Sequence, residues 1–483
     1  MDKKKEDNKG LTVTKSENFS EWYTQVIEKA ELADIRYNIK GFLVFQPWSV
    51  ISIEKMYSFL EKALQKKGHK PYFFPTLIPE SNLKKETSHI QGFTPSVFWV
   101  TEGGDKKLEE RYAMRPTSET AFYQMFALWI RSYKDLPFKT YQRANVFRYE
   151  TKATRPFLRS REFHWIETHC AFPNLESAET QVKEDMETTK DILHDTFGVP
   201  FIFFQRPEWD KFPGAYKTFA ADAVNPDGKL VQQPSTHIIK QEFSKAFDVK
   251  YKDKDGQDKY CYLTCYGPAV SRIFASVIIT HGDDKGLRFP WDIAPVQVAI
   301  VPIGPEKELS KKADEIKKAL SDYSVEIDAS EKSPGEKFNL WELKGVPIRI
   351  DLGLKELKDK KLTIFRRDLN KKETVAAKDL LKYIEKVAKE FTSNLIKQAD
   401  KVFEGRIKDA QNIEEIKKAI ESNSIARCSF CSTSKEGAEC AATIEKQLSA
   451  TVRGTKLETE KAGSKCAICG KKANHIVYIG RQY

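Results

Sequence analysis

The fold is decided by the stretch Asn145-Val146-Phe147-Arg148-Tyr149-Glu150, together with the segment Leu158-Arg159-Ser160-Arg161-Glu162-Phe163-His164-Trp165-Ile166-Glu167-Thr168-His169. Both segments are typical of β-strands, and the residues between them predict a hairpin. Because side chains alternate between the two faces of a strand, Arg148 and Glu150 share one face of the first strand. The second strand places four side chains on one face: Phe163, Trp165, Glu167 and His169. A face of aromatic and charged side chains indicates a binding pocket rather than a hydrophobic core.

Cations are concentrated around this hairpin. The loop 151–156 carries Lys152 and Arg155, and Arg159 follows it. Such cations repel one another unless an anion lies between them, and a guanidinium binds phosphate oxygens with two parallel hydrogen bonds. A surface hairpin with cross-strand ion pairs is the alternative, but it does not account for the loop cations. The pattern therefore predicts a site for a polyanion, with a triphosphate as the candidate ligand.

The length and composition restrict the class of protein. A chain of 483 residues is too long for one hydrophobic core and predicts about three domains. We find no signal-peptide pattern and no apolar run of about 20 residues, so we expect a cytoplasmic protein that does not span a membrane. The net charge of +11 favours an anionic partner without selecting one. We expect residues 1–18, which begin with a Lys-, Asp- and Glu-rich run, to form a disordered tail.

Two further regions show a regular pattern. Apolar residues recur with helical spacing over 53–67, and the segment 72–78 then predicts a strand. Pro75 lacks a backbone donor, so this strand should lie at a sheet edge or an interface. A compact α/β domain is predicted by the alternation of an amphipathic helix with strands. The helix spans 306–321, and the strands lie at 296–302, near Val325, at 346–350 and at 362–365.

The cysteines are unevenly distributed, since five of the eight lie between Cys428 and Cys469. In a chain without a secretory signal, metal ligation is favoured over disulfide formation. Cys466-x-x-Cys469 is half of a structural zinc site, and spacing alone favours Cys428-x-x-Cys431 as the other half. The remaining cysteines are predicted to be buried core thiols without a function. They are Cys170, Cys261 and Cys265.

Three blocks of the sequence resemble motifs 1, 2 and 3 of class II aminoacyl-tRNA synthetases and occur in the same order. The first is the helix and strand with Pro75, the second is the hairpin with Arg148, and the third is an apolar helix that begins near Arg272. Four further segments resemble prolyl-tRNA synthetases of the archaeal/eukaryotic type. They are Arg115–Thr120, Pro207–Ala215, His281–Leu287 and Trp341–Arg349. The similarity extends from about Phe19 to Tyr483, which is too long for a chance motif match.

The resemblance implies a multidomain α+β protein. A class II catalytic domain with an antiparallel sheet flanked by helices would span 19–290, an α/β anticodon-binding domain 291–395, and a small zinc-binding α+β domain 396–483. The implied activity is that of a proline–tRNA ligase, which activates proline with ATP and transfers it to proline tRNA. Mg²⁺ would accompany ATP, and the family forms homodimers. Between Glu150 and Gly267 there is no room for the editing insertion of the bacterial-type enzymes, so the pocket alone must reject alanine.

The resemblance also assigns residues to roles. The catalytic residues would be Arg148 and Arg272. ATP would be bound by Arg148, Glu150, Arg159, Ser160, Phe163, Gln232, Ser235 and Arg272. Proline would be bound by Thr117, Glu119, Arg148, Trp165, Glu167, His169 and His237. The anticodon would be read by Glu342, Arg349 and Lys355, and the metal held by Cys431, Cys440, Cys466 and Cys469, in place of the pair that spacing favours.

The chain departs from the family at a few positions. Pro234-Ser235 stands where the family usually has Gly-Thr, and Ser160 where it has Thr, although both serines keep a hydroxyl. Leu354 replaces a proline beside Lys355. Two alternatives remain: a synthetase-like protein that binds tRNA without catalysis, and a class IIa synthetase for another amino acid. The presence of Arg148, Arg159 and Arg272 favours catalysis over the first of these.

Overall fold

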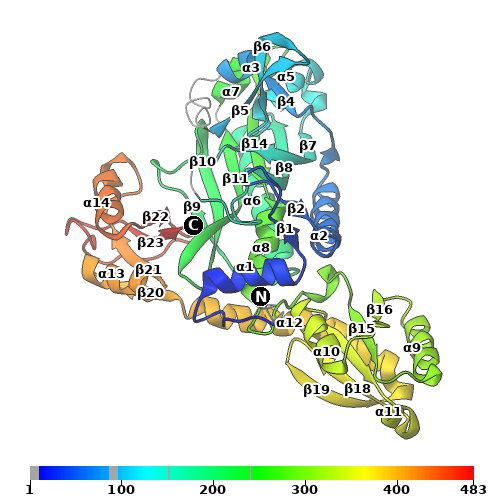
Figure 1. Ribbon diagram of the computed structural model, residues 1–483. Coiled ribbons are helices and arrows are strands. Elements are labelled where there is room, and N and C mark those ends of the chain that lie inside the picture. The colour runs from blue at the N-terminus through cyan, green and yellow to red at the C-terminus, as the bar shows by residue number, and fades with distance from the viewer. Residues whose placement is uncertain (1–9, 86–95, 151–152, 240) are drawn as a thin grey trace.

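An eleven-stranded sheet forms the centre of the protein and connects its first part to its last (Figure 1). The computed structural model describes residues 10–85, 96–150, 153–239 and 241–483. The strands of the sheet follow the order β20-β21-β23-β11-β14-β8-β7-β3. In addition, β10 pairs with β11, β9 pairs with β10, and β22 pairs with β23. The strands before residue 290 are β3 Lys70–Pro71, β7 Phe138–Phe147, β8 Glu162–Phe172, β9 Ile202–Gln205, β10 Ala215–Val224, β11 Lys229–Ile239 and β14 Tyr262–Gly267.

Smaller elements complete this part, which we call the core domain (residues 10–293). Its short sheets pair β1 Ala33–Asp34 with β2 Val44–Phe45, β12 Lys250–Lys252 with β13 Asp258–Tyr260, and β6 Lys106–Met114 with both β4 Leu77–Pro79 and β5 Phe98–Gly103. Its helices are α1 Phe19–Lys29, α2 Pro47–Lys66, α3 Glu80–Lys84, α5 Glu119–Trp129, α6 Leu175–Thr189, α7 Gln241–Ala246 and α8 Val270–His281. Short helical turns are η2 Tyr133–Asp135, η3 Lys190–His194 and η4 Trp291–Ile293.

The predicted hairpin is confirmed, because β7 and β8 pair antiparallel from Phe138 opposite Ala171 to Phe147 opposite Glu162. Ile166 packs in the core with residues of α1, α2 and α8, so its neighbours at odd positions of β8 face the other side of the sheet. The first strand ends earlier than predicted, at Phe147, so Arg148 and Glu150 follow it instead of belonging to it. Thr151 and Lys152 of the basic loop lie outside the described residues.

Two other sequence predictions need correction. The predicted strand over 72–78 is mostly irregular, because β3 ends at Pro71 and β4 begins only at Leu77, and Pro75 lies in the gap between them. In this gap the Tyr72 amide donates to the Tyr141 carbonyl at 2.8 Å, and the Phe74 amide donates to Gln142 Oε1 instead of a ladder partner. The edge position of the segment is confirmed, since β3 ends the sheet order. Residues 1–9 of the predicted disordered tail lie outside the described residues, but residues 10–18 pack along the core domain.

The predicted α/β domain occupies the lower right of Figure 1 (residues 294–404). Its sheet has the order β16-β15-β17-β18-β19, in which the first three strands are parallel and the last two antiparallel. The strands are β15 Val298–Pro302, β16 Val325–Ile327, β17 Ile348–Leu352, β18 Lys361–Arg366 and β19 Lys371–Ala376. The helices are α9 Lys307–Ala319, α10 Pro334–Leu343, α11 Leu354–Asp359, η5 Ala377–Asp379 and the long α12 Leu380–Glu404.

Two glycines let the core and α/β domains approach closely. Gly286 has a φ of +130°, and a Cβ atom on it would lie 2.5 Å from the Leu343 Cα. Gly345 has a φ of +71°, and its Cβ would lie 2.6 Å from the Leu287 carbonyl carbon. Other residues would be strained there and would push the backbones apart. Gly286 and Gly345 lie in the segments 281–287 and 341–349, which thus contact each other across the two domains.

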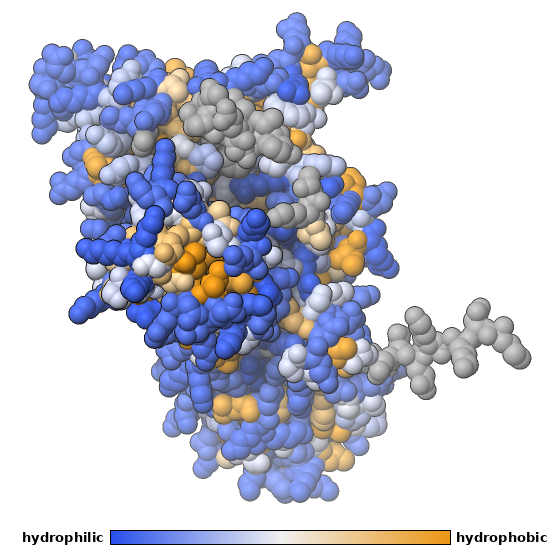
Figure 2. Space-filling model, turned by 90° about the vertical axis from the view of Figure 1, so that its left-hand side faces the viewer, coloured by the Kyte–Doolittle hydropathy of each residue, from blue (hydrophilic) through white to orange (hydrophobic). Residues whose placement is uncertain are grey.

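The C-terminal domain (residues 405–483) extends the large sheet on the left of Figure 1. Its strand β23 pairs in parallel with β11, at Lys229 opposite Arg481 and Leu230 opposite Gln482. Its elements are β20 Ile407–Ala410, α13 Ile413–Glu421, β21 Ile425–Phe430, η6 Lys435–Gly437, α14 Ala438–Leu448, β22 Thr451–Gly454 and β23 His475–Gln482. Figure 2, which looks onto this side, shows a mostly hydrophilic surface with small apolar areas. No helix within the described residues is long and apolar enough to cross a bilayer.

Candidate active site

A cavity of about 230 Å³ lies on the face of β8 that the sequence predicts to form a pocket. Strand register brings His169, Cys265 and His237 side by side on β8, β14 and β11. Eleven of the predicted site residues line the cavity: Thr117, Glu119, Arg148, Phe163, Trp165, Glu167, His169, Gln232, Ser235, His237 and Arg272. Three other predicted residues, Glu150, Arg159 and Ser160, lie outside its lining. Most of the predicted site is thus brought together.

Partly buried arginines define one end of the cavity. The Arg148 guanidinium lies 5.2 Å from the centre of the Phe163 ring and 5.8 Å from that of Trp165. Arg272, on α8, donates to the carbonyls of Leu158 and Gln232 at 3.3 and 3.2 Å. Burial, with Arg148 and Arg159 nearby, lowers the pKa of Arg272 to about 10. Mutual repulsion of cations at this end would be relieved by a bound anion.

Buried carboxylates define the other end. Glu167 accepts hydrogen bonds from Ser118 at 2.5 Å and from Gln142 at 2.6 Å, and His169 Nε2 lies 3.1 Å from its second oxygen. Glu119 begins helix α5 and accepts a hydrogen bond from Thr117. Glu119 and Glu167 are only 3% and 2% exposed, so a cationic ligand group that enters this end would meet two poorly hydrated carboxylates.

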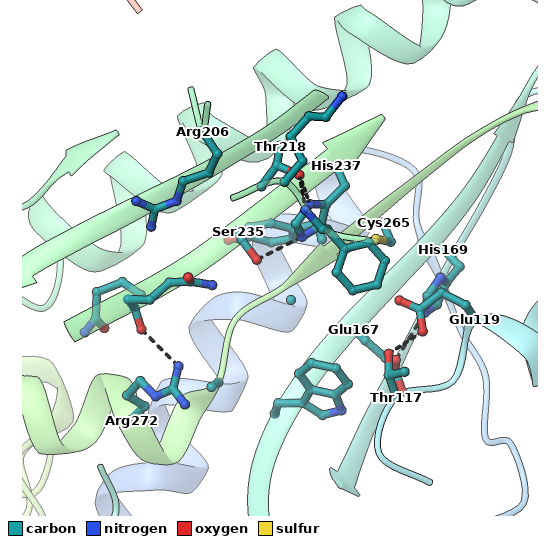
Figure 3. Close-up of a pocket in the computed structure, with 18 of the residues that line it drawn as sticks. Thr117, Glu119, Glu167, His169, Arg206, Thr218, Ser235, His237, Cys265 and Arg272 are labelled. Atoms are coloured by element: carbon teal, nitrogen blue, oxygen red, sulfur yellow. Dashed lines mark hydrogen bonds and ion pairs between the residues drawn. The ribbon is translucent and has the colours of Figure 1, made fainter. Parts of the chain in front are cut away.

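His237 lies across the cavity from these carboxylates (Figure 3). Its Nδ1 is 3.0 Å from Thr218 Oγ1 and its Nε2 is 3.1 Å from Ser235 Oγ. Burial lowers the pKa of His237 to about 4, so the ring is neutral at pH 7. The Ser235 hydroxyl therefore takes part in the pocket wall despite the departure from the family. Pro234 falls where the pairing of β10 and β11 shifts register, a place that tolerates a missing backbone donor.

Sequence reasoning missed part of the lining. The additional residues are Arg206, Asp210, Lys211, Phe212, Thr218, Gln233, Cys265, Tyr266, Gly267 and Ala269. The segment Pro207–Ala215 had already been singled out as a family motif, and this signal could have placed Asp210, Lys211 and Phe212 at the site. Cys265 was predicted to be a core thiol. It is only 6% exposed, as that prediction requires, but it faces the cavity.

The predicted anticodon residues are only partly brought together. Arg349 donates to Glu342 at 2.9 Å and to Asp351 at 2.7 Å, and its side chain is 2% exposed. Glu342 also accepts from Lys285 of the core domain at 2.9 Å. Lys355 is exposed on α11 and has no contact with this pair among the described interactions. Glu342 and Arg349 thus already satisfy each other in an ionic cluster at the domain contact.

Four cysteines of the C-terminal domain form a cluster. The sulfur atoms of Cys431, Cys440, Cys466 and Cys469 all lie within 4.8 Å of one another. Cys428 is buried in β21 and does not belong to the cluster. The structure thus brings together the four cysteines that the resemblance implies, and it leaves out Cys428, which spacing alone favours. Strand β21 continues to Phe430, and this keeps Cys428 within the sheet while Cys431 leaves it.

Models of three protein families match successive parts of the chain. The "tRNA synthetase class II core domain (G, H, P, S and T)" matches residues 98–281, and the "Anticodon binding domain" matches residues 297–387. The "Prolyl-tRNA synthetase, C-terminal" model matches residues 413–483.

Individual proteins match over nearly the full length. The proline–tRNA ligase of Thermofilum pendens is 46% identical to this chain, and the alignment covers 98% of this chain and 99% of the relative. The proline–tRNA ligase of Pyrococcus horikoshii is 41% identical, with 97% of this chain and 98% of the relative aligned. The solved structure of Giardia lamblia prolyl-tRNA synthetase in complex with prolyl-adenylate has a TM-score of 0.94 and 35% identity, covering 98% of this chain and all of its own. Together with the fold and the cavity, these similarities show that the chain belongs to the archaeal/eukaryotic-type prolyl-tRNA synthetases, a family of class II aminoacyl-tRNA synthetases.

Proposed function

We propose that the protein is a proline–tRNA ligase whose amino-acid activation takes place in the cavity beside β8. The observation that carries this proposal is one cavity with arginines at one end and two buried carboxylates at the other. Such a site fits a substrate pair that offers phosphates on one side and an ammonium on the other. In the reaction, an oxygen of the proline carboxylate attacks the α-phosphate of ATP and pyrophosphate leaves. The prolyl group is then transferred to a terminal ribose hydroxyl of proline tRNA.

The arginine end would hold ATP. Arg148 would bridge the α-phosphate and the proline carboxylate, because its planar fork can bind two oxygen-bearing groups at once. Arg272 would cover one face of the adenine and reach the γ-phosphate, while Phe163 stacks on the other face. Further contacts would come from Glu150, Arg159, Ser160, Gln232 and Ser235. Mg²⁺ would neutralise phosphate charge and be held largely by the phosphates themselves.

The carboxylate end would hold proline. Its secondary ammonium carries a charge that the buried Glu119 would accept, with Thr117 beside it. The aliphatic ring would lie between Trp165 and the neutral His237, and Glu167 with His169 would complete the wall. Glu167 is oriented by three neighbours that hydrogen bond to it, so the wall is preorganised before substrate binds.

ATP–pyrophosphate exchange with a panel of amino acids tests this function. We expect exchange with proline to exceed exchange with every other amino acid, because only a secondary ammonium on a five-membered ring fits both walls. Exchange with a different amino acid would identify another class IIa synthetase. Absence of exchange from a folded protein that still binds tRNA would identify a synthetase-like protein without catalysis. Either result would overturn the proposal.

Glu119→Gln should raise the KM for proline. The amide keeps the size of the side chain but cannot offset the ammonium charge, and a hydrogen bond to a charged group contributes about 1.5–3 kcal/mol, or roughly 10–150-fold. The KM for ATP should change little. Exchange kinetics with each substrate varied in turn measure both constants, and Glu102→Gln, at an exposed position of β5, is the control. Equal increases in both constants would refute the role of Glu119.

The exposed apolar surface supports a homodimer. Among the described residues, exposed large apolar side chains concentrate between 35 and 77: Ile35, Tyr37, Ile39, Val44, Val50, Ile51, Phe73 and Leu77. Phe73 is 88% exposed and lies in the segment around Pro75, next to Tyr72, whose ring stacks on Trp129. An isologous interface formed by α2 and this segment would remove these side chains from water.

Phe73→Asp should therefore separate the dimer. A carboxylate at the centre of an apolar interface is unpaired and costs several kcal/mol. Light scattering should give twice the 55.5 kDa of one chain for the wild type and a single chain for the variant. Val402→Asp is the matched control, because Val402 is also exposed, at 60%, but lies on α12. A monomeric wild type at micromolar concentration would contradict the dimer.

The other two domains would serve tRNA recognition and stability. The guanines of the anticodon would be contacted by Glu342, Arg349 and Lys355. Glu342 and Arg349 would then have to give up part of their ion pair in order to hydrogen bond to the base edges. The four cysteines fit a structural zinc ion. A tetrahedral site with metal–sulfur bonds of about 2.3 Å places its sulfurs about 3.8 Å apart. Cys431 Sγ and Cys440 Sγ are already 3.7 Å apart.

A further inference from the structure

The connection between β9 and β10, residues 206–214, forms one wall of the cavity, and we call it the pocket loop. Arg206, Asp210 and Phe212 of this loop line the cavity. The centre of the Phe212 ring lies 4.7 Å from that of His237. The Phe212 amide also donates to Thr218 Oγ1 at 2.9 Å, and the same oxygen contacts His237 Nδ1. Phe212 of the pocket loop therefore forms the cavity wall together with His237.

The outer side of the pocket loop is attached to the C-terminal domain. The Glu208 amide donates to the Thr433 carbonyl at 2.9 Å. The Trp209 ring packs on the hydrophobic core of the C-terminal domain, where its centre is 6.5 Å from that of Phe430. These contacts join residues more than 200 positions apart in the sequence. The loop therefore depends on a domain whose described residues contribute no side chain to the cavity lining.

A buried charge cluster forms the strongest part of this attachment. Arg453, on β22, donates to Asp222 from Nε at 2.7 Å and from Nη2 at 3.2 Å. Arg206 binds the same carboxylate from its Nη1 and Nη2 atoms at 3.0 and 2.8 Å, and its Nη1 also donates to the Arg453 carbonyl at 2.8 Å. The side chains of Arg206, Asp222 and Arg453 are at most 2% exposed. Asp210, which is 42% exposed, lies 3.9 Å from Arg206 and 3.8 Å from Arg453.

The cluster is balanced in charge. Two arginines face two aspartates, and Arg453 contacts both carboxylates. Without the Arg453 guanidinium, the buried Asp222 would lose one of its two arginine partners, and the partly exposed Asp210 would keep only its 3.9 Å contact to Arg206. A buried carboxylate that loses a partner favours rearrangement of its surroundings. The part of the cluster that is free to rearrange is the pocket loop, because Asp222 is fixed within β10.

We propose that Arg453 of the C-terminal domain is a positioning residue for the amino-acid end of the cavity, acting through Arg206 and Asp210 to hold Phe212 against His237. Trp209 is the second anchor of the same loop. Since the ligand of this end is proline, the inference rests on the proposed function. It assigns the C-terminal domain a part in amino-acid binding in addition to its own stability.

Arg453→Met tests this inference, because methionine fills much of the same volume without the charge. We expect the KM for proline in pyrophosphate exchange to rise about tenfold, since a small displacement of a binding wall weakens every contact made through it. The KM for ATP should change less than about twofold, because Phe212 of the pocket loop packs on His237, which belongs to the amino-acid end of the cavity. Arg453→Lys, which keeps the charge but not the two-pronged geometry, should fall between the wild type and Arg453→Met.

Arg427→Met is the matched control. Arg427 also belongs to the C-terminal domain and pairs with two carboxylates, Asp409 and Glu460, but its side chain is 31% exposed and distant from the cavity lining. Both KM values should stay at the wild-type level. If Arg453→Met lowers the melting temperature but changes neither KM, or changes both equally, Arg453 is only structural and the inference is overturned.

Trp209→Leu decides the question if Arg453→Met does not fold. This variant leaves the buried charges intact and removes only the ring that packs near Phe430. An increase confined to the KM for proline supports the inference, and unchanged kinetics overturn it. Failure of the proposed function is recognised separately, because the wild-type protein itself would then show no exchange with proline.

Discussion

Arg148→Ala should abolish proline-dependent pyrophosphate exchange. Arg148 lines the cavity at its arginine end, where its guanidinium lies over Phe163 and Trp165. There it would neutralise charge that develops on the α-phosphate as the carboxylate attacks, and loss of such an arginine costs a factor of about a thousand or more in rate. The rate of exchange at saturating ATP and proline measures this effect directly.

Arg148→Lys distinguishes charge from geometry. Lysine supplies a cation but not a planar fork, so we expect it to recover only a small part of the lost rate. Arg111→Ala, which removes a surface arginine that pairs with Glu80, should behave as the wild type. A loss of no more than a few-fold in Arg148→Ala would show that the residue does not contact the reacting groups.

Cys466→Ser should release a metal ion and unfold the segment around the cysteine cluster. Elemental analysis of the wild-type protein should find about one zinc ion per chain, because four thiolates form a closed tetrahedral site. The serine variant should contain almost none, and the C-terminal domain should melt at a lower temperature, because the free energy of metal binding is also folding free energy. Differential scanning calorimetry with and without a chelator measures this second effect.

Cys428→Ala is the control that the structure provides. Cys428 lies in β21 outside the cluster, so its removal should leave the metal in place, whereas Cys440→Ser should release it. The opposite pattern would show that spacing, rather than the arrangement of the fold, determines the ligands. A wild-type protein that is purified without metal and does not take up zinc would contradict the site itself.

The sequence was sufficient for features that depend on neighbouring residues. The alternation along β8 predicted which of its side chains face the pocket. The helical spacing over 53–67 predicted α2 from Ile53 to its end, but not its first turns. Pro75 indicated the sheet edge, but not that hydrogen bonds to Tyr141 and Gln142 would divide the strand. Local patterns specify which face of an element is polar, and they say little about which distant partners complete its hydrogen bonds.

The features that were missed depend on tertiary contacts. Cys265 looks like a core thiol in the sequence, and only the register with His169 and His237 places it in the cavity. The pairing of Arg453 with Asp222 joins residues 231 positions apart. Residues 10–18 begin after a charged run, yet the Lys15 ammonium lies over the Trp22 ring and donates to the end of α8. Charge in the sequence does not reveal whether a cation is solvated or has a buried partner.

The pairing of β23 with β11 brings Tyr483 to Arg159. The Tyr483 amide donates to the Leu230 carbonyl, and Arg159 donates to the Tyr483 carbonyl and lies 5.9 Å from its ring. An affinity tag or fusion partner attached after Tyr483 would begin next to Arg159, an arginine that we assign to ATP binding. Purification tags and fluorescent labels for this protein therefore belong at the N-terminus.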